Sequence, residues 1–172
     1  MRFSGFRHGE TARHVGTVVH RWLQRMADDA LKDWGAVRIT GYRATIRNQL
    51  SSSGVGGAEL DAATDRVLAA LVNAISDEKG RWVLGPHFES RNEYRIRTPD
   101  RTYVIDRVFK DEQGQRWIVD YKTSTHTGAD VQGFLDSERE RYAAQLQRYS
   151  AALDKNARRG LYFPMLGGWR EC

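Results

Sequence analysis

Two aspartates and a lysine lie in a segment, residues 102–122, whose alternating pattern predicts a β-hairpin. If the turn centres on Gln113, Asp106 faces Asp120 across the two strands, with their Cβ atoms roughly 5 Å apart. Alternation along the second strand places Lys122 on the same face as both acids. Two opposed carboxylates destabilise a sheet unless they are protonated, paired with a cation or bound to a metal. The pattern therefore predicts a chemical site on one face of this hairpin.

Three arrangements of this face are open from the residues alone. In the first, Lys122 neutralises Asp120 along its own strand and Asp106 lies at a solvated sheet edge. In the second, the two acids share a proton and perform general acid–base chemistry. In the third, they bind a hard divalent cation such as Mg²⁺ or Mn²⁺, with Lys122 beside it to meet an anionic substrate. The strand around Asp120 is apolar on both faces, as a central strand is, so this acid has no solvated edge and the metal site is favoured.

Further candidate residues lie on two predicted helices and near a predicted strand. His20 lies beside the apolar stripe of the first helix and can supply a third metal ligand, with Gly16 one turn earlier leaving space over the ring. Without other information, His20 is more often a packing residue, and Gln145 and Tyr149, one turn apart, are a core stripe ending in a polar neighbour. Two acids, Glu89 and Glu93, flank or open the second predicted strand, where they are either solvated edge charges or site carboxylates.

The elements that must position these residues follow from hydrophobic periodicity. Spacings of three and four predict helices over residues 11–31, 58–75 and 138–153, with a weaker helical pattern over 35–49. A period of two predicts four strands in a meander and one final strand, over residues 81–84, 92–97, 102–110, 115–122 and 160–163. Small and polar residues predict a break over 51–57 and a loop over 123–133. This order predicts a mixed α/β domain, with a β-sheet core flanked by α-helices.

Composition and charge narrow the class of protein. The 172 residues, 40% of them apolar, suffice for a single domain over 1–172, with a helical N-terminal region over residues 1–80 and a sheet and catalytic core over 81–172. No run approaches the roughly 20 apolar residues that span a bilayer, and no secretory signal is visible, so we expect a cytoplasmic protein without membrane contact. The single cysteine, Cys172, excludes a disulfide framework and a cysteine-ligated iron–sulfur cluster.

The net charge of +5 is concentrated in the first 50 residues, which hold nine Lys and Arg against four Asp and Glu. A cationic face on this region of the chain would suit a polyanion such as nucleic acid. No base-reading motif is visible, so we expect contacts to phosphates and a weak sequence preference.

Four motifs in order, over nearly the full length, resemble the PD-(D/E)xK nuclease superfamily and specifically its RecB-like branch, found at the C-terminal end of helicase-nucleases that process DNA ends. The motifs are Gly16-Thr-Val-Val-His20-Arg-Trp-Leu, Ile105-Asp106-Arg, Ile118-Val-Asp120-Tyr-Lys122-Thr-Ser and Gln145-Leu-Gln-Arg-Tyr149. Residues 159–164 and the later Gly168-Trp169 are similar to the end of this domain in bacterial UvrD-type helicases and exonuclease V beta subunits. The resemblance implies a restriction-endonuclease-like mixed β-sheet core flanked by α-helices.

The resemblance also implies a role for each matching residue. The implied metal ligands are the side chains of His20, Asp106 and Asp120 and the backbone carbonyl of Tyr121. Lys122 would position the attacking water, and Gln145 and Tyr149 would steady the site and the DNA strand. Glu93 is similar to an acidic position of the family's second strand, with Glu89 as the competing assignment. Several relatives hold an iron–sulfur cluster through four cysteines, which this chain lacks.

The implied activity is Mg²⁺- or Mn²⁺-dependent hydrolysis of DNA phosphodiester bonds in end processing, recombination or repair. No phosphate-binding loop of the Gly-x-x-x-x-Gly-Lys-Ser/Thr type is present, so unwinding would come from a helicase domain or subunit, in the same longer chain or as a separate protein.

Two other classes of function are open. A nuclease-like DNA-binding or docking module without cleavage has no physical reason to retain the opposed acids Asp106 and Asp120. A metal-dependent hydrolase of a small phosphorylated molecule predicts an enclosed pocket and no long basic groove.

Overall fold

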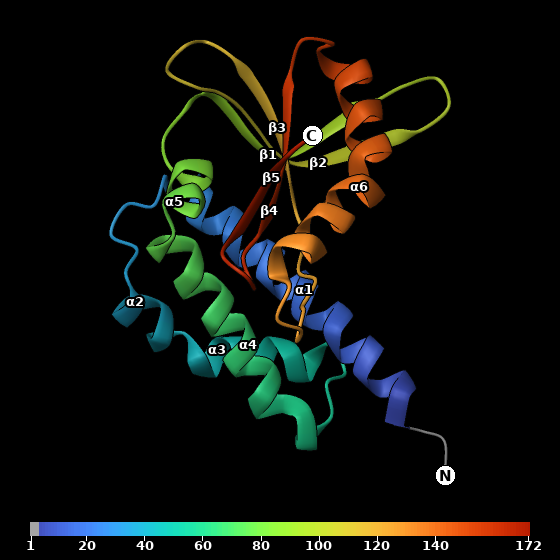
Figure 1. Ribbon diagram of the computed structural model, residues 1–172. Helices are drawn as coiled ribbons and strands as arrows, with labels where there is room; N and C mark the ends of the chain where they lie inside the picture. The colour runs from blue at the N-terminus through green and yellow to red at the C-terminus, as the bar shows by residue number, and fades with distance from the viewer. Residues whose placement is uncertain (1–3) are drawn as a thin grey trace.

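The computed structural model describes residues 4–172, and the side chains from residue 9 onward. A five-stranded sheet lies between a group of helices on one face and a single long helix on the other (Figure 1). The helices before the sheet are α1 (Ser4–Asp28), α2 (Ala36–Gly41), α3 (Arg43–Ser52), α4 (Gly57–Ser76) and α5 (Glu78–Leu84). The strands and the last helix are β1 (Phe88–Arg97), β2 (Thr102–Lys110), β3 (Arg116–Tyr121), α6 (Val131–Leu153), β4 (Arg158–Phe163) and β5 (Gly168–Glu171). The predicted mixed α/β class, with a sheet flanked by helices, is confirmed.

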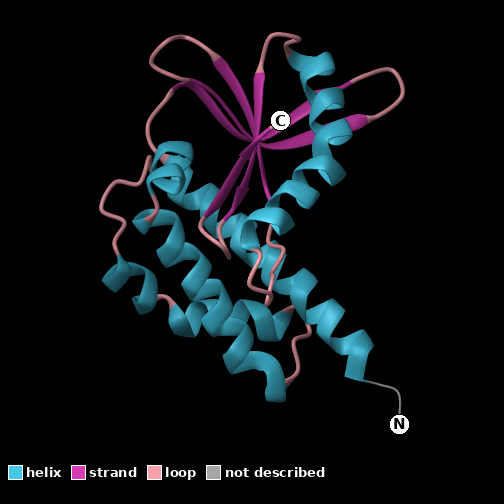
Figure 2. Cartoon of the chain, viewed as in Figure 1, coloured by secondary structure: helices cyan, strands magenta, loops and turns pink. Residues whose placement is uncertain are grey.

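The sheet has the strand order β1-β2-β3-β4-β5, so β3 is its central strand. Antiparallel pairs join β1 to β2, β2 to β3 and β4 to β5, whereas β3 and β4 are parallel and are connected through α6. In Figure 2 the strands of the five-stranded sheet point in different directions, as in a strongly twisted sheet, and α6 lies beside them. Burial of β3 on both faces explains why its sequence is apolar almost throughout.

The turn between β2 and β3 sets their register as predicted. The carboxylate of Asp111 accepts hydrogen bonds from the amides of Gln113 and Gln115, and Gly114 adopts a φ of 77° that favours glycine. Lys110 pairs with Arg116, and each later pair moves one residue away from the turn on both strands. The turn is therefore centred on residue 113.

The two faces of the sheet contribute to two hydrophobic cores. Phe109, Val119 and Tyr121 pack with the helices that precede the sheet, whereas Val108 and Ile118 pack with α6. This alternation places α1 and α6 on either side of the β2–β3 pair.

Most predicted helices and strands are present, with different ends. The helices predicted over 11–31 and 58–75 correspond to α1 and α4, the weak pattern over 35–49 to α2 and α3, and α6 begins seven residues before the predicted 138. Asp130 starts α6 by accepting a hydrogen bond from the Gly133 amide, which shortens the predicted loop. The strand over 160–163 is confirmed within β4, and β5 had no predicted counterpart.

The strand predicted over 81–84 is wrong, because these residues belong to helix α5. Asp77 caps this helix by accepting a hydrogen bond from the Gly80 amide, and Val83 and Leu84 are fully buried. The meander therefore has three strands rather than four. Four consecutive residues do not distinguish a short buried helix from a strand, since they span barely more than one helical turn.

One buried cation fixes the position of α5 on the sheet. The guanidinium of Arg107, which is 1% exposed, donates to the carbonyls of Val83 and Gly85 at the end of α5 and to the side chain of Asn92 on β1. Carbonyls at a helix C-terminus favour a cation, so the buried charge is stabilised without a carboxylate partner. Arg107 directly follows Asp106 and thereby anchors this segment of β2.

Arg107→Met should lower the free energy of unfolding by about 3 kcal/mol, because three buried acceptors lose a charged donor. Urea denaturation followed by circular dichroism measures this change. Arg91→Met, at an exposed position of β1, is the control and should stay within about 0.5 kcal/mol of the wild type. Equal stability of the two variants would contradict the anchoring role.

Among residues 4–172, no helix has the length and apolar content needed to cross a lipid bilayer.

Candidate active site

The predicted site residues from α1, β2, α6 and the end of β3 line one hollow of about 940 Å³. They are His20, Asp106, Asp120, Tyr121, Lys122, Gln145 and Tyr149. The register of β2 and β3 places Asp106 opposite Asp120, continuing from the pair Arg107–Val119. Of the two acids left open, Glu93 lines a neighbouring hollow, and Glu89 pairs with Lys110 and Arg116 on the surface.

The first acid of the pair is held between α1 and the end of β3. The Asp106 carboxylate accepts a hydrogen bond from the Tyr121 amide at 2.7 Å and lies 3.3 Å from Nε2 of His20. This nitrogen is also 3.0 Å from the carbonyl oxygen of Tyr121, and Nδ1 of His20 is 2.9 Å from the carbonyl oxygen of Gly16. The α1 backbone thus orients the imidazole toward Asp106 and the Tyr121 carbonyl.

The second acid is held by the lysine that follows it. Nζ of Lys122 is 2.6 Å from the Asp120 carboxylate and 3.5 Å from the side-chain oxygen of Gln145. The Gln145 amide donates to the Tyr149 hydroxyl at 2.6 Å. One continuous polar chain therefore runs from Asp120 on β3 through Lys122 to the polar side of α6.

Burial and charge drive the pKa values of the two acids apart. Burial and the charge of Asp106 raise the pKa of Asp120 to about 7, against the opposing effect of Lys122. Burial would raise the pKa of Asp106 as well, but the hydrogen bond and charge of His20 outweigh it and lower this pKa. Burial alone would lower the pKa of His20, whereas its hydrogen bond to Asp106 and the nearby negative charges raise it to about 9. The centre therefore attracts positive charge strongly.

The geometry combines features of the three open arrangements. Lys122 pairs with Asp120, as in the first, but Asp106 is only 14% exposed and lies away from a solvated edge. The raised pKa of Asp120 beside Asp106 matches the shared proton of the second.

The donor atoms also suit the third arrangement. In the portion of the chain that the structure describes, no group of three or more His, Cys, Asp or Glu side chains has the spacing of a metal site. The imidazole of His20, the Asp106 carboxylate and the Tyr121 carbonyl nevertheless converge within 3.3 Å, beside the second carboxylate. Two carboxylates, one carbonyl and one imidazole are a donor set that Mg²⁺ and Mn²⁺ accept in proteins. The residues present therefore fit such an ion by their chemistry.

Tyr142, which lies on α6 three residues before Gln145, was given no role in the site by the sequence analysis. The ammonium of Lys122 lies over its ring, 3.7 Å from the centroid, within the range of a cation–π interaction. Arg141, its neighbour, adds a second cation to the lining of the hollow. The signal in the sequence was the spacing of three between Tyr142 and Gln145, which places both on one helical face.

The loop after β3 is fastened to α1 and α6 around the site. The buried carboxylate of Glu138 on α6 accepts a hydrogen bond from the Ser124 hydroxyl. On the other side, a Cβ at Gly16 would lie 2.7 Å from Oγ1 of Thr123. Gly16 thus leaves room for the Thr123 side chain, whereas we had expected it to leave space over the His20 ring.

Gly16→Ala should lower the free energy of unfolding by about 1–2 kcal/mol, since the added methyl forces α1 away from Thr123. The control is Gly9→Ala in the same helix, where a Cβ meets open space and should stabilise by about 0.5–1 kcal/mol. Adding Thr123→Ala to Gly16→Ala should recover most of the loss in a urea-denaturation cycle. The close approach would be refuted if Gly16→Ala behaved like Gly9→Ala.

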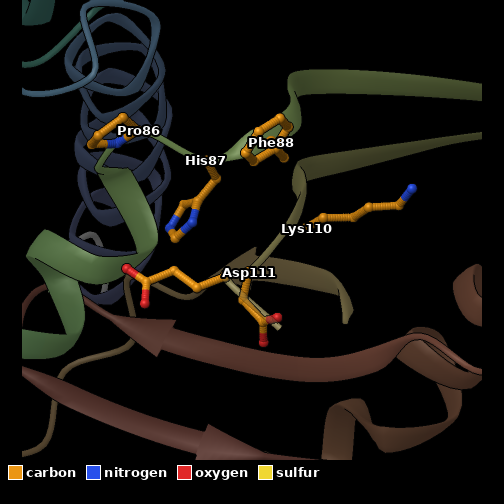
Figure 3. Close-up of a pocket in the computed structure, with 6 residues that line it drawn as sticks. Pro86, His87, Phe88, Lys110 and Asp111 are labelled. Carbon is orange, nitrogen blue, oxygen red and sulfur yellow. The ribbon is translucent and has the colours of Figure 1, made fainter. Parts of the chain in front are cut away.

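A separate surface pocket of about 460 Å³ contains none of the predicted site residues. Pro86, His87 and Phe88 line it together with Lys110 and the start of the β2–β3 turn (Figure 3). The candidate chemistry therefore lies in the hollow around Asp106 and Asp120.

Comparison with known proteins gives one family. The model of the PD-(D/E)XK nuclease superfamily matches residues 5–165 and so includes every residue of the candidate site. Curated proteins yielded no match to the chain.

Proposed function

Because the chain belongs to the PD-(D/E)XK nuclease superfamily, we propose that it is a metal-dependent DNA nuclease domain that hydrolyses phosphodiester bonds. The observation that carries the proposal is the opposition of Asp106 and Asp120 beside Lys122 in one hollow. In this proposal the nuclease is a single domain over residues 1–172, with a helical N-terminal region over 1–80 and a sheet and catalytic core over 81–172.

The proposed metal ligands are the side chains of His20, Asp106 and Asp120 and the carbonyl of Tyr121. When bound, a Mg²⁺ or Mn²⁺ ion supplies charge neutralisation at the phosphate and lowers the pKa of a bound water. The ligands come from α1, β2 and β3, so the site requires α1 to pack against the sheet. Gly16 orients the imidazole through its carbonyl oxygen.

Lys122 is the proposed catalytic cation. Its ammonium touches Asp120, Gln145 and the ring of Tyr142, and these three contacts hold it at the hollow. From there it orients the attacking water and stabilises the negative charge that develops on the phosphoryl oxygens. Lysine suits this task as a compact point charge. Gln145, supported by Tyr149, holds the Lys122 ammonium in place, and both residues contact the DNA strand.

The charge of the surroundings favours DNA over a small phosphorylated molecule. We call the hollow that contains Asp106 and Asp120 the carboxylate hollow. A neighbouring hollow adjoins it, because the two share the lining residues Arg13, His20 and Thr123. Further arginines line this extended surface, which is the basic groove that a polymeric anion needs.

The motif order that resembles the RecB-like branch supports a role in helicase-coupled DNA end processing, recombination or repair. The helicase in this proposal is another region of a longer chain or a separate subunit. The nuclease would act in the cytoplasm. A DNA-binding or docking module without cleavage is the alternative, and cleavage assays distinguish the two.

Asp120→Asn and Lys122→Ala should each reduce cleavage of labelled single- and double-stranded DNA at least about 100-fold, because one removes a ligand charge and the other the positioned ammonium. The assay uses purified protein with Mg²⁺, Mn²⁺ or EDTA, and EDTA should abolish cleavage by the wild type. Glu89→Gln, which alters an exposed acid outside the hollow, is the matched control and should cleave at the wild-type rate.

Two results would count against these roles. Cleavage that survives EDTA and both substitutions comes from another site or a contaminant. DNA binding by a wild type that cuts no substrate with any of the ions supports the non-cleaving module instead.

Tyr142→Leu should lower kcat about tenfold with little change in KM, since it removes the ring beneath the Lys122 ammonium but leaves the ligands in place. Tyr142→Phe keeps an aromatic face and should retain most of the wild-type kcat. Steady-state cleavage of one oligonucleotide compares the variants. Equal losses in Phe and Leu would assign the effect to the hydroxyl rather than to the ring.

A further inference from the structure

A second hollow, of about 720 Å³, lies between α1 and β1 beside the carboxylate hollow. The two share Arg13, His20 and Thr123 in their linings, so His20 stands at the boundary between them. We call it the arginine hollow after the three arginines that line it, which are Arg13, Arg21 and Arg95. None of the motifs that suggested the function includes Arg13 or Arg95.

The arginines approach the hollow from two elements. Arg13 and Arg21 are eight residues apart on α1, with Thr17 midway between them, so they lie along one side of the helix. Arg95 extends from β1 opposite them. Packing of α1 against β1 therefore builds a cleft with guanidinium groups on both walls.

The three arginines of the hollow have no close carboxylate partner among the described residues. Among the side chains of residues 9–172, neither Arg21 nor Arg95 makes an ion pair, and both are exposed. Arg13 has only a 3.6 Å contact with Glu10 in which both side chains are mostly exposed, an interaction worth little in water.

One acid shares the hollow with the arginines. Glu93 lines it and takes a φ of 48°, a left-handed conformation that is uncommon for glutamate, between the paired residues Asn92 and Tyr94 of β1. A single carboxylate does not balance three guanidiniums, so the residues that line the hollow carry an excess of positive charge.

We propose that the arginine hollow binds the sugar–phosphate backbone of the DNA strand immediately beside the phosphate that is cleaved. This inference rests on the proposed nuclease function and specifies where the substrate extends from that site. Guanidinium groups form forked hydrogen bonds to phosphate oxygens, and such contacts position a strand without reading its bases. The strand passes His20 as it runs from the arginine hollow to the carboxylates, so the bound backbone sets which phosphate reaches Asp106 and Asp120.

The binding test uses the double variant Arg21→Gln/Arg95→Gln and a fluorescent 20-nucleotide single strand in EDTA, followed by anisotropy over a range of salt concentrations. The loss of two phosphate contacts should make the slope of log K against log salt shallower by about 1.4–2 and weaken binding about tenfold at low salt. The double variant Arg66→Gln/Arg91→Gln removes the same charge outside both hollows and is the matched control, with the wild-type slope expected.

The cleavage test compares the 20-mer with a small chromogenic diester, thymidine 5′-(4-nitrophenyl) phosphate, that is too short to span both hollows. The ratio of kcat/KM on the 20-mer to kcat/KM on the diester should fall about tenfold in Arg21→Gln/Arg95→Gln. An unchanged ratio together with a wild-type salt slope overturns the inference. If the wild type hydrolyses neither substrate, the proposed nuclease function fails, whereas the salt slope still decides whether the arginine hollow binds the backbone.

Discussion

The opposition of two carboxylates on neighbouring strands is the constraint on which the rest of this structure depends. The register of β2 and β3 brings Asp106 opposite Asp120, and the central position of β3 denies the second acid contact with bulk water. Like charges at this separation in a buried setting require compensation. His20 from α1 compensates the charge of Asp106, and Lys122 compensates the charge of Asp120. Because Gln145 on α6 contacts the Lys122 ammonium, the pair of acids depends on both α1 and α6. Burial and the charge of Asp106 raise the pKa of Asp120 to about 7. Burial opposes the protonation of His20, but the nearby acids raise its pKa to about 9, so both groups hold a proton more readily than they do in water.

Much of the pairing of these acids could be predicted because it depends on local rules. A hairpin with a short polar turn has few registers, and the Asp111 turn selects the one centred on Gln113. The continuous apolar sequence of β3 predicts a central strand, and the periodicity of α1 predicts the helix that carries His20. Residue types and spacing were thus enough to indicate one site, although which atoms touch required the coordinates.

Other features depend on partners far apart in the chain, and the sequence did not predict them. The segment over 81–84 is a helix because Asp77 caps it and the Arg107 guanidinium binds its last carbonyls, and this second contact is 24 residues away. Arg107 is buried, although arginine is mostly an exposed residue type. The spacing of Tyr142 and Gln145 placed both on one helical face, but the contact of the Tyr142 ring with the Lys122 ammonium required the coordinates. Long-range side-chain packing of this kind leaves no periodic trace in a single sequence.

The parallel pairing of β3 with β4 has a consequence for the order in which the domain is built. The main-chain amide of Lys122 donates to the carbonyl of Tyr162, which lies on β4 and follows α6 in the chain. A nascent polypeptide emerges from its N-terminus, so until β4 has left the ribosome the strand that carries Asp120 is an unpaired edge. The backbone of Lys122 gains this hydrogen bond only after residue 162 has been synthesised. A translation product that ends before β4 therefore lacks the hydrogen bond that supports the backbone of Lys122.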